Sequence, residues 1–266
     1  RTTPTKSSAA TDVYKRQKVY SAGLIKSWSL DLIQNLPLSG LREWKEDLKK
    51  AITFSPPHIS IYDLNIENGT VFKKLVDLGK LQLPNDEQAF RNSETTHLIL
   101  KNSGYSRYEI SNYCLPRHQS RHNRVYWSGL GWWGFGQGST SSPWGQKLTR
   151  PRVSKEYKEW VMGQYKLSLD SSLNNIDYVY QELDEKIMLG LRLKEGIDIY
   201  KFFEEQNWEN KKLESNLRKL LSKWERFLES GLLVKNGNRF FLSDPQGMEL
   251  SNQILISMFE WWDEIN

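Results

Sequence analysis

The sequence predicts an α/β fold, because short apolar runs of strand length alternate with an amphipathic helical segment in its first half. Residues 28–33 form one such run, and residues 58–62 form a second. Between them, apolar residues recur at helical spacing and predict a helix over 40–53 that the prolines at 56–57 stop. Strand, helix and strand of these lengths predict a right-handed βαβ unit with parallel strands.

The middle of the chain adds further helices and one short strand. Residues 86–103 predict a helix, with Gly104 at the position that commonly ends one. Residues 108–113 predict a short strand or extended edge, and residues 157–169 and 182–193 predict helices. The last two helices fall within the C-terminal part of the chain.

The C-terminal part, 151–266, is predicted to be a separate unit. Apolar residues form a helical stripe over 213–228, and Gly231 ends it. Two apolar runs within 232–242 flank an Asn-Gly pair, which is a strong hairpin signal. An Asp-Pro pair then opens a last helix over about 244–262. Helices followed by a hairpin look like a winged-helix module.

Composition and charge restrict the function classes. The chain has 266 residues, enough for one large domain or for one medium and one small domain. No apolar run approaches the roughly 20 residues that span a bilayer. The net charge is +5, of which +3 lies within the first 17 residues. The remaining +2 gives little support for a general nucleic-acid-binding surface.

The first 17 residues are rich in Ser, Thr and basic side chains and show no periodicity. We therefore expect a disordered leader that is not native to this protein. A transit peptide is the alternative, since such peptides are rich in Ser and Arg and poor in acids. The expected division of the chain is 1–17, 18–150 and 151–266.

The chain has one cysteine, Cys114, so no disulfide can form within it. This count fits the reducing cytoplasm, where we expect the protein to be located. A lone cysteine of this kind is most often a small buried residue.

The segment 121–127, Arg-His-Asn-Arg-Val-Tyr-Trp, concentrates residues suited to a flat, charged ligand. Five glycines follow it between residues 129 and 138, with Trp and Phe between them. An imidazole can ligate a metal, aromatic rings can stack on a planar molecule, and glycines let the backbone approach it. Arginines can pair with carboxylates. This combination suits an anionic, planar, metal-containing ligand such as haem.

The segments 108–113 (Tyr-Glu-Ile-Ser-Asn-Tyr) and 121–127 resemble the HemW family. These are haem chaperones related to oxygen-independent coproporphyrinogen III oxidase and built on a radical-SAM core. Three further segments agree: 31–37, 57–64 and 188–196. The resemblance runs from about residue 20 to the C-terminus, and its most specific element is His-Asn-x-x-Tyr-Trp.

The resemblance implies that the βαβ unit supplies the last two strands of a partial radical-SAM (β/α) barrel. An α+β linker region and the winged-helix-like domain would follow it. In this family a 4Fe-4S cluster is held by Cys-x3-Cys-x2-Cys, which this chain lacks. We therefore expect an N-terminally incomplete family member that cannot perform radical SAM chemistry as given. The cluster and SAM would bind through residues outside this chain.

The family also suggests candidate site residues. His122 would be the axial ligand of haem iron; its alternative role is a hydrogen bond within a loop. Arg121 and Arg124, and less specifically Arg117, would pair with haem propionates unless they are solvated surface residues. Asp31, placed at a strand end, would lie near SAM, or else cap the following turn. No catalytic residue is assigned.

Two other patterns are weaker indications of function. Cys114, His118 and His122 are four residues apart and could offer zinc three ligands on a helix, but Pro116 interrupts that spacing. Residues 129–134 match Gly-x-Gly-x-x-Gly without the strand and helix that a dinucleotide site needs. Close packing of the backbone explains these glycines better.

The predicted function is that of a haem chaperone, which binds haem and transfers it to acceptor proteins. One alternative is the oxidase activity of the sister family. The other is nucleic-acid binding by the winged-helix-like domain, where acidic residues 214, 225 and 229 interrupt the basic surface and argue against it. The basic residues of its first helix are Lys211, Lys212, Arg218, Lys219, Lys223 and Arg226. Assembly into a homo-oligomer stays open.

Overall fold

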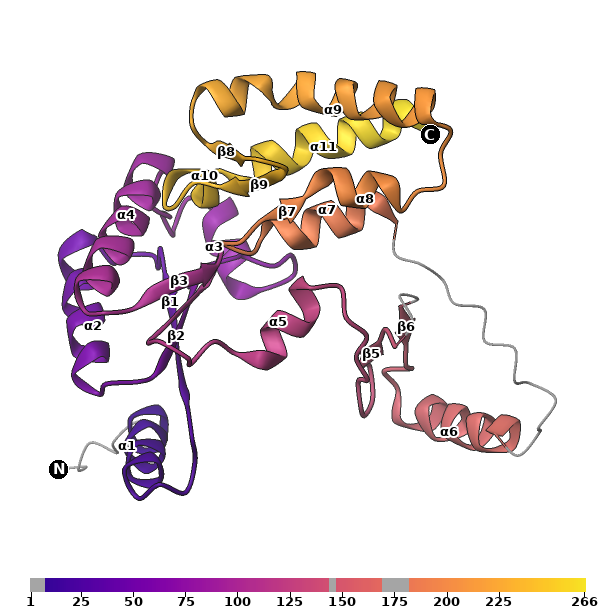
Figure 1. The fold of residues 1–266 in the computed structure, drawn as a ribbon. Helices are drawn as coiled ribbons and strands as arrows, with labels where there is room; N and C mark the ends of the chain where they lie inside the picture. Colours follow the sequence, from indigo (N-terminus) through magenta and orange to yellow (C-terminus); the bar gives the residue numbers. More distant parts are fainter. Residues whose placement is uncertain (1–7, 144–146, 169–181) are drawn as a thin grey trace, which may run out of the picture. The chain divides into compact units, whose positions relative to one another are not determined.

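The computed structural model describes residues 8–143, 147–168 and 182–266 (Figure 1). These residues form two compact units: the first unit lies within Arg1–Ser120 and Leu242–Ser251, and the second within Arg121–Phe241 and Asn252–Asn266. The division therefore falls at Ser120, not at the expected boundary after residue 150. Residues 121–150 belong to the second unit because their side chains bind its helices, as in the ion pair of Lys147 with Glu185.

Helix α1 (Ser8–Ser21) begins the described chain. The expectation of disorder is wrong for residues 8–17, and residues 1–7 lie outside the described part of the chain. Asp12 and Arg16 form an ion pair one helical turn apart, at 2.8 Å. The ring of Tyr14 packs edge-on against Phe54, with centroids 5.6 Å apart. This packing explains why the helix forms despite its weak apolar periodicity.

The first unit contains a four-stranded sheet in the order β1-β2-β4-β3. As predicted, β1 (Ser29–Gln34) and β2 (His58–Asp63) are parallel, with helix α2 (Leu41–Thr53) between them in the sequence. Strand β2 also pairs with β4 (Asn112–Cys114), which is antiparallel to it.

The prediction of one strand over 108–113 is wrong, because this segment turns back on itself. Strand β3 (Ser106–Glu109) pairs antiparallel with β4. Side chains close the turn: Arg107 Nε donates to the carbonyl oxygen of Ile110 at 3.0 Å, and the Glu109 carboxylate accepts from the backbone N–H of Ser111 at 3.1 Å.

One face of this sheet packs against helices α2 and α4 (Asp86–Asn102). The core cluster joins Trp44, Leu48, Ile59, Ile61, Leu100, Tyr105 and Tyr113. Trp44 Nε1 donates to Thr96 Oγ1 at 2.8 Å and links the two helices. The short helix α3 (Val71–Asp77) precedes α4.

The opposite face of β1 and β2 is more open, since side chains alternate along a strand. Asp31, Ile33 and Tyr62 are exposed there. The predicted strand-length run over 28–33 is thus only partly buried. Strand β1 lies at the sheet edge, and its buried residue is Gln34.

The second unit begins with helix α5 (Arg121–Trp127), which the sequence did not predict. Loop and short strands follow, as predicted: β5 (Thr140–Ser141) pairs antiparallel with β6 (Leu148–Thr149). The helix expected over 157–169 is α6 (Ser154–Ser168), and residue 169 lies outside the described residues.

The remaining elements of the second unit are helices and the strands of a three-stranded sheet. They are α7 (Leu183–Leu191), β7 (Ile197–Asp198), α8 (Ile199–Glu204), α9 (Asn210–Glu229), β8 (Leu233–Asn236) and β9 (Arg239–Leu242). The strand order is β7-β9-β8. The predicted hairpin is confirmed, and Gly237 has the positive φ of +59° that its turn requires. Trp224, Phe240, Phe203 and Trp261 fill the core.

The last predicted helix, 244–262, is divided into α10 (Gln246–Glu249) and α11 (Ser251–Ile265). Leu250 separates them with φ −98° and ψ 16°. The break coincides with tertiary contacts, because Glu249 is held by Arg107 and Ser93 within the first unit. No helix among the described residues is long and apolar enough to cross a membrane.

Candidate functional site

Helix α5 presents His122 to solvent. One turn later, Tyr126 packs edge-on against the His122 ring, with centroids 4.9 Å apart and planes at 86°. Gly129, with φ +65°, ends the helix, and the backbone N–H of Leu130 donates to the carbonyl oxygen of Val125 at 3.0 Å. The imidazole is thus exposed, but its ring is braced by an aromatic neighbour.

The chain after α5 folds back onto the helix and remains apolar at its surface. Trp132 packs against Tyr126 with ring centroids 4.8 Å apart. The residues around Trp132 include three large apolar side chains that solvent reaches: Leu130, Trp133 and Phe135 are 58%, 56% and 86% exposed. Exposed apolar side chains that gather into a contiguous patch mark binding surfaces. We call His122, Tyr126, Leu130, Trp132, Trp133 and Phe135 the imidazole–aromatic surface.

Tyr126 and Trp127 are half-buried rather than core residues, because α5 contains no buried residue. Neither side chain therefore belongs to the buried core. The guanidinium of Arg192 lies over the Trp127 ring at 4.4 Å from its centroid, a cation–π contact. This contact anchors Trp127 and leaves Tyr126 as the ring beside His122.

The three candidate arginines differ in their surroundings. Arg124 Nη1 pairs with Glu195 Oε1 at 2.7 Å, so its charge already has a carboxylate partner. Arg121 is exposed on the first residue of α5. Arg117 lies in the first unit, in a loop with φ +70°. Of the two on α5, Arg121 is better placed than Arg124 to receive a ligand carboxylate.

The glycines after α5 serve close backbone packing, as predicted. A Cβ atom added at Gly131 would overlap the carbonyl oxygen of Pro143, and one at Gly134 would overlap that of Thr140. Trp132 forms an isolated antiparallel bridge with Ser142 across the same gap. The segment is a folded loop against β5 and does not lead from a strand into a helix, so the dinucleotide reading finds no support.

The structure does not bring Cys114, His118 and His122 together on one helix, as Pro116 indicated. Cys114 is buried in strand β4, and His118 Nδ1 lies 3.1 Å from Ser27 Oγ, so only His122 is on a helix. The described residues contain no group of three or more His, Cys, Asp or Glu side chains able to hold a metal ion. A single exposed imidazole does fit haem, because the porphyrin itself supplies the other nitrogen ligands.

Asp31 is the third residue of β1, not a strand-end residue as the sequence suggested, because the strand continues to Gln34. Its carboxylate Oδ1 accepts a hydrogen bond from Ser29 Oγ at 3.1 Å, within the strand rather than from a turn. The parallel register places Ser60 beside it on β2. Asp31 is therefore an exposed carboxylate on the open face of the sheet.

A buried histidine lies on the same face, and no motif in the sequence selects it. His58 Nδ1 is 2.8 Å from Ser29 Oγ, and its Nε2 is 2.8 Å from Tyr108 Oη. His58 is 4% exposed, and this burial lowers its pKa to about 4; nearby His118 also lowers it, while Asp31 raises it. The only sequence signal was the strand period of two, which puts His58 on the face of Asp31 once the register is known.

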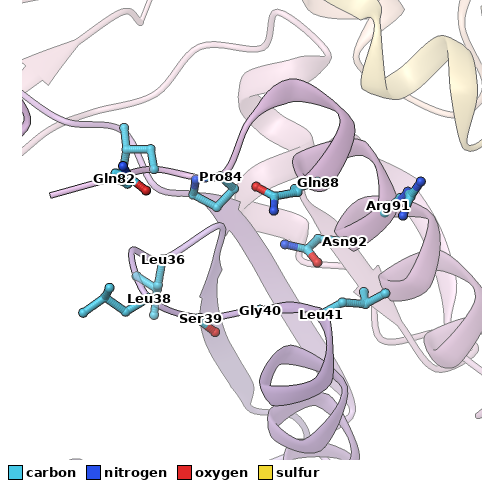
Figure 2. A pocket seen from close by; sticks show the side chains of 11 residues that line it. Leu36, Leu38, Ser39, Gly40, Leu41, Gln82, Pro84, Gln88, Arg91 and Asn92 are labelled. Carbon is cyan, nitrogen blue, oxygen red and sulfur yellow. The ribbon is translucent and has the colours of Figure 1, made fainter. Parts of the chain in front are cut away.

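The loop between β1 and α2 borders a pocket of about 410 Å³ (Figure 2). This loop reads Asn-Leu-Pro-Leu-Ser-Gly, and its Asn35 and Leu38 have positive φ of 62° and 61°. Asn92 Nδ2 donates to Asn35 Oδ1 at 2.8 Å and holds the loop to α4. The backbone N–H of Gly40 donates to Glu43 Oε2 at 3.2 Å, so a carboxylate of the helix itself occupies the start of α2.

Comparison with known proteins gives a consistent answer. The family model described as the HemN C-terminal domain matches residues 181–250. The heme chaperone HemW of Synechocystis sp. is 34% identical over 249 residues, which cover 90% of this chain and 60% of the relative. By sequence, the chain belongs with the HemW family. A second relative, the radical S-adenosyl methionine domain-containing protein 1, mitochondrial, of Danio rerio, is 29% identical over 86% of this chain and 50% of its own length.

Among solved structures, the radical SAM enzyme coproporphyrinogen III oxidase (HemN) of Escherichia coli matches with a TM-score of 0.64. The match covers 92% of this chain and 58% of that protein at 14% identity, so it shows a shared α/β fold. This chain thus spans 60% of the Synechocystis relative and 50% of the Danio rerio relative.

Proposed function

We propose that this protein binds haem and transfers it to acceptor proteins, with His122 as the axial ligand of the iron. The observation that carries the proposal is the imidazole–aromatic surface, where an exposed His122 stands beside Tyr126 and Trp132. Relatives named as heme chaperones match most of the chain. The chemistry of the site and the family therefore agree.

Each residue of this surface has a physical role in the proposal. The His122 imidazole donates a nitrogen lone pair to the iron, and Tyr126 limits the rotation of its ring. Trp133 and Phe135 offer apolar area against the macrocycle, at roughly 25 cal/mol for each Å² removed from water. Arg121 pairs with a propionate. Haem held on a surface by one protein ligand can leave it for an acceptor.

The proposal for SAM and the 4Fe-4S cluster is more limited. We infer that both belong to the longer family protein and that Asp31 lies near SAM. The open-face carboxylate suits the cationic end of such a ligand. Cluster binding does not fit the described residues: Cys114 is the single cysteine of the sequence, and burial raises the pKa of its thiol, which disfavours the thiolate that iron needs. We therefore derive no step through the cluster.

We also infer that the C-terminal part is a winged-helix-like domain, since α7, β7, α8, α9 and the β8–β9 hairpin follow one another in that order. Its charges do not favour DNA. Lys223 on α9 pairs with Glu264 at 2.7 Å, and Lys212 lies over the Trp208 ring at 5.5 Å. Docking of a protein partner is the role that we propose for this domain. Salt-dependent DNA binding that is lost in a Lys219→Ala, Lys223→Ala variant would contradict that assignment.

The competing function is coproporphyrinogen III oxidation. The likeness to HemN supports a common fold and not a common reaction, because the two chains are 14% identical. Product analysis of the longer protein distinguishes the two: a chaperone leaves coproporphyrinogen III unchanged, whereas an oxidase decarboxylates it. For this chain, a haem titration of wild type and His122→Ala tests the chaperone proposal directly, with His118→Ala as the matched control. We place the protein in the cytoplasm, and size-exclusion chromatography with light scattering tests whether it forms a homo-oligomer.

A further inference from the structure

Four side chains on the open face of the first unit's sheet form one hydrogen-bonded chain. Ser29 Oγ lies 3.1 Å from Asp31 Oδ1 and 2.8 Å from His58 Nδ1. His58 Nε2 lies 2.8 Å from Tyr108 Oη, which accepts from the backbone N–H of Ser120 at 3.3 Å. The chain therefore runs from a buried tyrosine, through a buried histidine, to an exposed carboxylate. Three strands contribute to it: β1, β2 and β3.

The number of hydrogens fixes the direction of this chain. An ionised Asp31 can only accept, so the single hydroxyl hydrogen of Ser29 must point to it. Ser29 then has only lone pairs to offer His58, so Nδ1 carries the ring proton and donates. His58 Nε2 is left as an acceptor, which the Tyr108 hydroxyl supplies with a hydrogen. If the direction of donation were reversed, the Ser29 hydroxyl would donate to His58. The oxygen atoms of Ser29 and Asp31 would then lie 3.1 Å apart without a hydrogen between them.

We propose that His58 and Tyr108 are positioning residues for Asp31. They fix the neutral Nδ1–H form of the imidazole, which turns the Ser29 hydroxyl hydrogen onto Asp31 Oδ1 and holds the carboxylate in one orientation. The other oxygen of Asp31 then serves a ligand that carries an N–H or O–H donor. This inference rests on and deepens the proposed placement of Asp31 near SAM. The hydrogen-bonded chain from Tyr108 to Asp31, which we call the relay, depends only on residues of the first unit.

The surroundings of His58 keep its imidazole neutral. A neutral imidazole carries one ring proton, which can sit on either Nδ1 or Nε2. The groups that face it are Asp31 on β1, Tyr108 on β3, Cys114 directly opposite on β4, and His118. Burial lowers the pKa of His58 to about 4 and thus keeps the ring uncharged at pH 7. Asp31 is exposed and lies three hydrogen bonds away from Tyr108. Asp31 can therefore be replaced without disturbing the core.

Nitrogen-15 NMR of the full chain labelled at its four histidines tests the relay at pH 7. His58→Gln assigns the His58 signals. In the wild type we expect the proton on Nδ1, with a bias of about fivefold, because the neutral hydrogen bonds of the chain favour that form. In Asp31→Ala the Ser29 hydroxyl is released to donate to Nδ1, so we expect most of the Nδ1–H bias to be lost.

The matched control is Tyr62→Phe, since Tyr62 is exposed on the same face and neighbours Ile33 rather than Ser29 or Asp31 in the register. We expect it to leave the His58 signals unchanged. A wild-type His58 protonated on Nε2 would overturn the proposal, as would an Nδ1–H bias that survives Asp31→Ala. Because the readout is the ring of His58, either result is independent of whether SAM or haem binds.

Discussion

The guanidinium of Arg107 on β3 donates to Glu249 Oε1 at 2.7 Å, which ties the segment Leu242–Ser251 to the sheet of the first unit. Asp244 lies 3.6 Å from the same guanidinium, and Ser93 Oγ donates to Glu249 Oε2 at 2.7 Å. Only 4% of the Arg107 side chain is exposed. A late segment of the sequence therefore completes an early unit through a buried charged group.

Replacing this carboxylate should destabilise the first unit strongly. Glu249→Ala leaves Arg107 buried beside Asp244 alone, and breaking a buried pair costs about 3 kcal/mol. Denaturant unfolding followed by a probe in the first unit measures the change. Glu264→Ala is the control, because Glu264 pairs with Lys223 at the surface and should cost about 0.5 kcal/mol. Similar losses for the two variants would contradict the buried role.

Stability should depend on pH through His58. Its pKa is about 4 in the folded chain and 6.5 for an ordinary, solvated histidine, so the unfolded chain binds the extra proton between these values. The stability that the neutral ring contributes is complete above about pH 6.5 and is lost as the pH falls through 4, in total about 3 kcal/mol. Unfolding free energies from pH 7 to 4 should fall less steeply in His58→Gln. Equal slopes would show that other groups cause the loss.

Gly134 and Gly163, both in the second unit, should respond oppositely to replacement by alanine. Gly134→Ala places Cβ on the carbonyl of Thr140, so the loop beside α5 must shift and haem affinity should fall about tenfold. Gly163→Ala, in helix α6, meets open space and should stabilise that helix by about 1 kcal/mol. Haem titration and thermal unfolding of both variants provide the check. A harmless Gly134→Ala would mean that this loop does not shape the site.

The edge of the first sheet should make the isolated chain prone to self-association. Strand β1 is an edge strand with Ile33 46% exposed, and Leu38 in the next loop is 92% exposed. Ile33→Lys should reduce light scattering at a given concentration, because a charge on an edge strand opposes pairing with another copy. Val161→Lys is the control on helix α6. A wild-type chain that stays monomeric and unfolds cooperatively would contradict this expectation.

Local patterns predicted several elements well. The stripe of Trp44 and Leu48 predicted α2, and the Asn236-Gly237 pair predicted the β8–β9 hairpin. In each case the signal lies within a few residues of the structure it specifies. The parallel pairing of β1 with β2 was also predictable, because a helix-length connection returns the chain in the same direction.

The sequence failed where distant residues decide the outcome. The break at Leu250 depends on Arg107, which lies 142 positions from Glu249 along the chain, and α1 depends in part on the contact of Tyr14 with Phe54. The same holds for the site. His122 could be selected from its motif, but the ion pair of Arg124 with Glu195 and the link from Asp31 to His58 require three-dimensional contacts.

The most direct test of the central claim is a haem titration followed by absorbance, comparing wild type, His122→Ala and His118→Ala. The account predicts a saturable Soret shift in the wild type and in His118→Ala, since His118 lies in the first unit beside Ser27. In His122→Ala the affinity should fall at least tenfold, and the spectrum of histidine-ligated iron should be lost. If neither the Soret shift nor the haem affinity changes in His122→Ala, the assignment of His122 as the haem ligand is contradicted.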